Sequence, residues 1–333
     1  MKFTHQIFLI LSLIVITIPR FNWGELGPLK SFVGSKPFDI EQYITYTEYF
    51  RGEKENGTLM EGPFAYRPLV PFLASFLPYE ALTSINLINL LFLIFTLFPL
   101  IGLLKLFKFS GNYLFIGGLM FVFSFPVFYY GTSGYIDSTL MAFLMTGAYL
   151  IFSKKYFLFF ITFIFGMGAK ETIILIIPVF AVHLFSQKGL SIRNRITPVL
   201  LLIIIYVAGM ILLRKLTPGV ESYLWYPSIG VLFKNLIRFK TYLSILLTFG
   251  LPGIGALVYI FKLTRKGDGF TNNEIALATG VFISILISFF SLFAAYADGR
   301  HIWTSYPFTI PLALLYLKSI NLSGFLLFKS SDN

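Results

Sequence analysis

The sequence contains no cysteine and only three histidines, His5, His183 and His301. Disulfide bonds, thiolate nucleophiles and cysteine-built metal sites are therefore excluded. The histidines are widely spaced along the chain, which argues against a metal site built from them. Charged residues are also scarce: they make up 12% of the 333 residues, whereas about a quarter of a soluble domain is charged. The chain is thus not an ordinary soluble domain.

Apolar and aromatic side chains dominate instead. Hydrophobic residues make up 56% of the chain, 40 residues are Phe, and the mean hydropathy is +0.79. Runs of Leu, Ile and Phe recur at roughly 20 residues, the length that a helix needs to cross a bilayer. These runs lack the alternation of apolar and polar residues that marks a membrane β-barrel. The sequence predicts an all-α fold, a polytopic transmembrane helical bundle with residues 1–333 as one integral-membrane domain.

Ten apolar segments are predicted to span the membrane. The fifth and sixth are short, so they either tilt or form a hairpin that does not fully cross. The first is expected to be an uncleaved anchor, because Ile18-Pro19-Arg20 lacks the small residues of a signal-peptide cleavage site. The ten predicted segments are 4–20, 82–104, 113–130, 138–153, 156–169, 172–186, 197–213, 241–261, 275–295 and 306–319.

The distribution of positive charge predicts the orientation of these segments. Both termini and every second connection together carry thirteen of the 26 Lys and Arg residues but only three acids, Asp268, Glu274 and Asp332. Because Lys and Arg are enriched in cytoplasmic segments, both termini are expected in the cytoplasm, in a multi-pass protein of the cytoplasmic membrane. The same distribution argues against nucleic acid as a partner, since the net charge of +11 does not form one basic face.

Residues 214–240 break this charge pattern, because they carry five basic residues on the predicted outer side. Within them, 229–240 has the composition of an amphipathic helix. Such a helix lies on the bilayer surface and attracts anionic lipid headgroups, which would account for the exception.

The connection after the first predicted span, residues 20–81, is unusually long and polar. It holds eight of the fifteen Asp and Glu residues of the chain. A helix is expected from Asp39 to Arg51, ended by Gly52. The apolar run Phe72–Leu77 is too short to span and is expected to lie at the membrane interface. Because loops commonly carry binding and catalytic residues, this first extracytoplasmic loop is where chemistry is expected.

Charged residues at the outer ends of the predicted spans form the candidate site. A charge is unfavourable by about 2.5–3.5 kcal/mol at the centre of a span, so several charges at one end of a bundle indicate a function. The candidates are Asp39 and Glu41 as catalytic acids, and Arg67, Asp137, Lys170, Glu171, Asp298, Arg300 and His301 as ligands of substrate or lipid phosphate.

Several of these residues also have a structural interpretation. Asp39 is a general base, the N-cap of its helix with Gln42 as the reciprocal partner, or both. Asp137 either belongs to the site or caps the fourth span. Arg67 either binds a phosphate, or extends to the membrane interface or pairs with Glu61.

The remaining candidates have similar alternatives. Lys170 and Glu171 are adjacent, so on a helix they project about 100° apart and cannot form a tight mutual pair. Glu171 would cap the sixth span in the structural interpretation. Arg300 either binds an anion or anchors the chain at the membrane interface beside Trp303. His301 is expected to support the site rather than to catalyse.

Five segments of the chain resemble the GT-C superfamily of polytopic membrane glycosyltransferases, which use polyprenyl-phosphate-linked sugars. They are spread over the chain from end to end, and each is short, so the likeness is more one of architecture than of sequence. The segments are FDIEQYITYTEYFRG (38–52), PFAYRPLVPFLA (63–74), GYIDS (134–138), AKETIILIIP (169–178) and DGRHIWTSYPFTIP (298–311).

The resemblance implies an enzyme that moves a sugar from a polyprenyl-phosphate donor to a lipid or glycan acceptor by direct displacement. Asp39 would be the catalytic base and Arg300 the ligand of the lipid phosphate, with Arg67 or Lys170 assisting. Glu41 takes the second place of the acidic motif, as Asp-x-Glu rather than Asp-x-Asp. That departure leaves open whether Asp39 and Glu41 hold a divalent cation.

Other functions remain as alternatives. A transporter or flippase of lipid-linked sugar would share the basic rim but needs polar groups at the bilayer midplane. The span interiors offer little beyond Asn86, Asn89, His183 and some hydroxyls, which disfavours transport. A surface-polysaccharide polymerase would use closely related chemistry, and a scaffold subunit of a larger envelope complex would leave the outer acids merely solvated.

Overall fold

The computed structural model describes residues 1–23, 38–54, 60–217, 220–223, 227–266, 269–294 and 297–320, and within them the fold is all-α apart from one pair of short strands. Five helices in these ranges are long and apolar enough to cross a membrane. They are α1 (Phe3–Trp23), α5 (Ala81–Leu106), α11 (Ile192–Leu216), α13 (Phe239–Lys266) and α14 (Asn272–Ala294). The expectation of a helical membrane protein fits these lengths and compositions.

Shorter apolar helices lie between and after the long ones. They are α6 (Gly111–Val122), α7 (Phe125–Tyr130), α8 (Asp137–Phe152), α9 (Tyr156–Ala169), η3 (Glu171–Leu175), α10 (Ile176–Phe185) and α16 (Tyr306–Ser319). The predicted span 113–130 is two helices rather than one, because α6 ends at Val122 and α7 begins at Phe125. Pro126 has no backbone N–H to donate to the carbonyl of Val122, as a continuous helix would require. It lies in the first turn of α7, where that bond is not needed.

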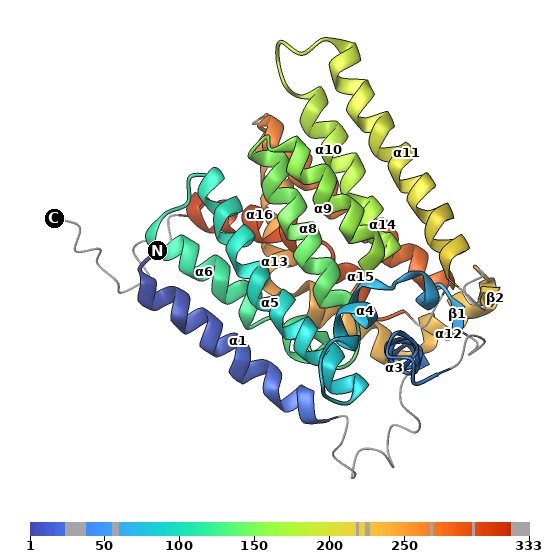
Figure 1. Cartoon of the computed structure of the whole chain (residues 1–333). Helices are drawn as coiled ribbons and strands as arrows, with labels where there is room; N and C mark the ends of the chain where they lie inside the picture. Colours follow the sequence, from blue (N-terminus) through green and yellow to red (C-terminus); the bar gives the residue numbers. More distant parts are fainter. Residues whose placement is uncertain are drawn as a thin grey trace.

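The core of the bundle is built around α8 and α16, whose side chains are mostly buried. Helix α5 packs along α8, and α13 packs along α16. Helix α1 runs along one edge of the molecule and α11 stands at another, as Figure 1 shows. Only Leu202 of α11 is buried, so this helix turns most of its surface away from the rest of the chain.

Several short helices and the two strands lie toward one end of the bundle, at the lower right of Figure 1. They comprise α3 (Phe38–Phe50), β1 (Met60–Gly62), η2 (Phe64–Tyr66), α4 (Leu69–Ser75), β2 (Val220–Tyr223), α12 (Ile229–Ile237) and α15 (Arg300–Trp303). Strand β1 pairs in parallel with β2, which ties the first loop to the end of α11.

The helix expected from Asp39 to Arg51 is present as α3. Helix α3 ends at Phe50, one residue before the predicted end. Gly52 follows at φ +73°, a backbone conformation that glycine adopts readily. The apolar run expected at 72–77 overlaps helix α4, which ends at Ser75. Phe72 within this helix and Phe76 directly after it are 44% and 69% exposed.

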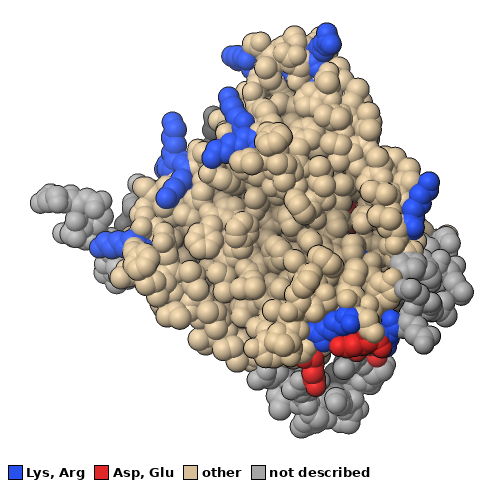
Figure 2. All heavy atoms as spheres, in the orientation of Figure 1, with Lys and Arg blue, Asp and Glu red and all other residues tan. Residues whose placement is uncertain are grey.

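Charge is distributed unevenly over the surface (Figure 2). On the face shown, the acidic side chains lie at the lower edge, at the end of the molecule where α3 is found in Figure 1. Lys and Arg project without visible acids from the upper and left edges, and a broad uncharged belt lies between. This belt and the long apolar helices match the composition expected of a chain embedded in lipid.

Candidate functional site

Arg300 lies at the centre of the candidate site, between two carboxylates. Its Nη1 donates to Oδ2 of Asp39 at 2.9 Å, although 261 positions separate the two residues. Its Nε donates to both carboxylate oxygens of Asp298, at 2.9 and 3.1 Å. The structure therefore brings the first-loop acid and the late arginine into direct contact.

The local sequence explains how Arg300 is held. Its backbone N–H also donates to Oδ1 of Asp298 at 2.9 Å, a side-chain turn that Asp readily forms two residues back along the chain. The guanidinium lies over the ring of Tyr135, 3.9 Å from its centroid. Burial acts to lower the pKa of Arg300, but Asp298, Tyr135 and Asp39 outweigh it and raise the pKa well above its usual value. The guanidinium thus stays charged.

Lys170 and Asp137 form a second ion pair in the same region. Lys170 Nζ lies 2.5 Å from Asp137 Oδ1, and the side chains are 7% and 4% exposed. Asp137 is the first residue of α8, and Lys170 directly follows the last residue of α9. Each charge therefore sits at the helix end whose partial charge is opposite to its own.

Arg67 and Glu171 form the third pair. Nε and Nη2 of Arg67 donate to the two carboxylate oxygens of Glu171, at 2.8 and 2.5 Å. Nη1 of Arg67 donates to the hydroxyl of Tyr43 at 2.7 Å. Burial acts to lower the pKa of Arg67, but Glu171 and Tyr43 outweigh it, so the pKa is raised. This bidentate geometry is the arrangement in which Arg binds planar anions most strongly.

The three pairs form one charged network. Tyr43 follows Asp39 by four residues on α3, so the two side chains lie on one helix face and connect the first pair to the third. Lys170 and Glu171 are adjacent and connect the third pair to the second. Asp137 and Arg300 line one small void together with Leu140, Met141, Trp303 and Thr304.

The structure also decides between the interpretations left open for several residues. Asp39 lies inside the first turn of α3 rather than at its cap, and Gln42 accepts from the backbone N–H of Glu61. No side-chain cap is formed at the start of α8, so the interpretation of Asp137 as a cap is wrong. Arg67 pairs with Glu171 and not with Glu61.

Glu41 is the predicted site residue that the structure does not bring to this network. Its side chain is exposed, and it follows Asp39 by two residues on α3. Side chains two apart on a helix project about 200° from each other. The pair therefore does not fit a shared divalent cation, and no three His, Asp or Glu residues in the described ranges are grouped as metal ligands.

Tyr43, Tyr135 and Trp303 contribute to the site although none was a predicted site residue. Tyr43 could have been found from its i+4 spacing to Asp39. Tyr135 lies within the segment GYIDS, but nothing in the sequence indicates that it stacks on Arg300. Trp303 is buried, and its Nε1 has no hydrogen-bond partner among the described residues.

His301 is half-buried beside the network and is neutral at physiological pH. Burial lowers the pKa of its imidazole to about 4; Lys170 and Arg300 act in the same direction, and Asp298 and Asp137 oppose them. An imidazole in the unfolded chain titrates near pH 6.5. Between these two values the unfolded state binds more protons, so stability from this group is complete above about pH 6.5 and is lost as the pH falls to 4.

We therefore expect acidification from pH 7 to pH 5 to destabilise the wild type more than the variant His301→Gln. The difference should be about 1–2 kcal/mol over this interval. Unfolding in detergent, followed at both pH values, measures it. An equal response of the two proteins would show that His301 takes up its proton equally in the folded and unfolded states.

Gly299 allows α15 to approach α13 closely. A Cβ at this position would overlap with the hydroxyl oxygen of Thr248 and the backbone carbonyl oxygen of Ser244. We expect Gly299→Ala to destabilise the protein by about 1–3 kcal/mol, as overpacking does, and to displace Arg300. Gly269→Ala is the matched control, because a Cβ there meets nothing within 4 Å. Thermal unfolding of both variants would show the effect, and equal stability would mean that α15 is not packed as described.

No protein-family model matches this chain, and a comparison with curated proteins finds no significant match. The interpretation of the site therefore depends on its own geometry: three buried or half-buried cations, each held by carboxylates, at one end of an apolar bundle.

Proposed function

We propose that this chain is a membrane glycosyltransferase of the GT-C type, which moves a sugar from a polyprenyl-phosphate donor to a lipid or glycan acceptor. The observation that carries the proposal is the contact between Asp39 and Arg300, at 2.9 Å. It joins a carboxylate that can accept a proton to a guanidinium that can bind a phosphate.

The proposal includes a topology. Both termini lie in the cytoplasm, and residues 20–81 lie outside, so that the charged network faces the extracytoplasmic leaflet of the cytoplasmic membrane. The chain crosses about ten times if the shorter apolar helices are counted as tilted or paired segments. Helix α4 lies in the outer interface, which is supported by the exposed rings of Phe72, Phe76 and Tyr79.

The reaction is a direct displacement at the anomeric carbon of the sugar. Asp39 accepts the proton of an acceptor hydroxyl, and the acceptor oxygen forms the new bond to the anomeric carbon as the bond from that carbon to the phosphate oxygen breaks. Polyprenyl phosphate leaves with the bonding electrons. Cations that meet this developing charge supply what is usually the largest catalytic contribution.

Arg300 couples donor binding to the release of the base. Among the described residues, Nη1 and Nε of Arg300 contact Asp39 and Asp298, whereas Nη2 donates to neither. A donor phosphate that binds Nη2 and draws the guanidinium toward itself would compete with Asp39 for Nη1. The carboxylate would then be free to accept the proton of the acceptor hydroxyl.

A divalent cation is not required by this scheme. Asp39 and Glu41 project to different sides of α3, so no step is derived through an ion held by both. The cations Arg300, Lys170 and Arg67 supply positive charge next to the proposed phosphate position, and Arg67 and Lys170 hold their neighbours Glu171 and Asp137 in place.

A transfer assay with the purified chain in lipid nanodiscs tests this function. The donor is a polyprenyl-phosphate-linked sugar, and the acceptors are a mixture of lipids and glycans. We expect glycosylated acceptor and free polyprenyl phosphate in equal amounts. The same donor in proteoliposomes distinguishes the main alternative. Movement of intact donor across the bilayer without release of polyprenyl phosphate would support a flippase and contradict the transferase. Repeated addition to one growing product would instead support a polysaccharide polymerase, which uses the same site.

A further inference from the structure

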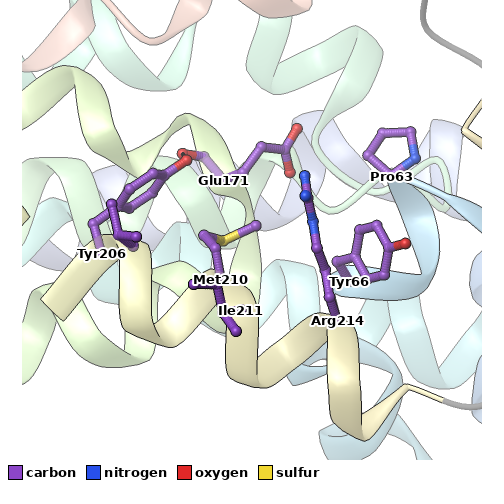
Figure 3. A pocket seen from close by; sticks show the side chains of 8 residues that line it. Pro63, Tyr66, Glu171, Tyr206, Met210, Ile211 and Arg214 are labelled. Carbon is purple, nitrogen blue, oxygen red and sulfur yellow. Dashed lines mark hydrogen bonds between the residues drawn. The ribbon is translucent and has the colours of Figure 1, made fainter. Parts of the chain in front are cut away.

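A pocket of about 290 Å³ lies between α11 and the first-loop segment, beside the charged network. One wall is formed by α11, and the other by Pro63, Tyr66 and Glu171 (Figure 3). Figure 3 also shows Arg214, in the last turn of α11, extending toward the carboxylate of Glu171 and past the ring of Tyr66. The pocket combines an apolar wall with a charged upper end.

The charge of Arg214 is not compensated within the described part of the chain. Its guanidinium carbon lies 5.5 Å from the centroid of the Tyr66 ring, and it forms no ion pair with a described carboxylate. Glu171 is the one acid among the residues that line the pocket. Both of its carboxylate oxygens already accept hydrogen bonds from Arg67. Arg214 is exposed at the edge of an apolar region and has no described carboxylate as a partner, so an anionic ligand is favoured beside it.

The apolar wall opens toward the surroundings of α11. Val207 and Ile211 line the pocket and are each 51% exposed, and Ile204, one turn further from Arg214, is 63% exposed. Because α11 is a candidate membrane span of 25 residues, this wall is continuous with the hydrocarbon around the protein. A ligand would therefore enter sideways from the bilayer.

We propose that this pocket binds a bilayer phospholipid with an anionic headgroup. The phosphate pairs with Arg214, and the first part of an acyl chain lies against Val207, Met210 and Ile211. A phospholipid is favoured over a rarer lipid by mass action, because it is the most abundant amphiphile beside α11. An anionic headgroup is in turn favoured because Arg214 lines the pocket and forms no ion pair with a described carboxylate.

The bound lipid would act on the proposed catalytic network through one residue. Glu171 lines the pocket and also holds Arg67, which in turn holds Tyr43 of α3. The binding itself goes beyond the proposed transferase activity and does not depend on it, so it is tested without any sugar donor.

The test measures how many phospholipids the full-length chain retains, and how tightly, by native mass spectrometry after titration with phosphatidylglycerol or phosphatidylcholine. We expect one tightly held phosphatidylglycerol per chain and weaker retention of phosphatidylcholine. Arg214→Gln should weaken the binding of phosphatidylglycerol by about tenfold, as the loss of one charge-assisted hydrogen bond does. Arg193→Gln, at the opposite end of α11, is the matched control and should bind as the wild type does.

A second variant keeps the test decisive if Arg214→Gln folds poorly. Val207→Trp fills the pocket from its exposed wall and should also abolish the tight binding. Unchanged binding in both variants would overturn the proposal. Displacement of the lipid by inorganic phosphate alone would reduce the pocket to an anion site, and displacement by an equimolar amount of polyprenyl phosphate would assign it to the donor. Either result contradicts a phospholipid site.

Discussion

Asp39→Asn is expected to reduce sugar transfer by about 10²–10⁴-fold, the contribution of a positioned general base. An amide has nearly the shape of a carboxylate but does not accept the acceptor's proton. Because the neutral amide competes less with the donor phosphate for Arg300 than the carboxylate does, binding of the donor should not weaken. Initial rates with polyprenyl-phosphate-linked sugar, measured at saturating donor, separate these two effects.

Glu48→Gln is the matched control for this experiment. Glu48 lies on the same helix as Asp39 but pairs with Lys54 at the surface, 3.0 Å away. The variant Glu48→Gln should therefore transfer sugar at the rate of the wild type. Glu41→Gln tests the second acid of the motif separately. Full activity in Asp39→Asn, with the protein folded, would remove Asp39 from the role of base.

Lys170→Met is expected to produce the largest loss of stability among single substitutions at the site, about 3–5 kcal/mol. The variant leaves Asp137, whose side chain is 4% exposed, as a buried charge without its partner. Unfolding by denaturant in a fixed detergent micelle measures the loss, with the midpoint and slope compared to the wild type.

Two further variants show whether the pairing itself is responsible. The double variant Lys170→Met with Asp137→Leu removes both charges and should regain most of the stability. Lys54→Met breaks the exposed pair with Glu48 and should cost less than about 1 kcal/mol. If the double variant were as unstable as Lys170→Met alone, the loss would come from packing and the ion pair would not contribute as described.

The gathering of charged residues at one end of the molecule could be predicted from the sequence. Asp39, Arg67, Asp137, Lys170 and Arg300 follow or precede apolar runs, and alternation of charge along the chain indicates which ends share a side. Lys170 and Glu171 do not pair with each other, as predicted, but helix geometry is not the reason. Lys170 has an extended backbone between α9 and η3, and each of the two residues pairs with another partner.

The choice of partners could not be predicted in the same way. Arg67 and Glu171 are 104 positions apart, and their contact depends on how η2 and η3 are placed by the packing of other helices. Periodicity describes which face of a helix is apolar but not which helix it meets. From the sequence, Asp137 and Glu171 could be helix caps and Arg67 a phosphate ligand. In the structure each of these residues forms an ion pair.

The break near Pro126 illustrates a second limit. The segment 113–130 is apolar throughout and long enough for one span, and proline is tolerated inside membrane helices when neighbours satisfy the freed carbonyl. In the structure α6 ends before Ser124, whose hydroxyl donates to the carbonyl of Phe121, and α7 starts anew. Composition alone does not distinguish a kinked helix from two separate ones.

The most direct test of the central claim is a cryo-electron microscopy map of the full-length chain in nanodiscs with bound polyprenyl phosphate. The account predicts a phosphate within about 3 Å of the Arg300 guanidinium, with Asp39 released from Nη1 and facing the same space. A phosphate bound elsewhere on the molecule, with Asp39 and Arg300 still paired, would contradict it.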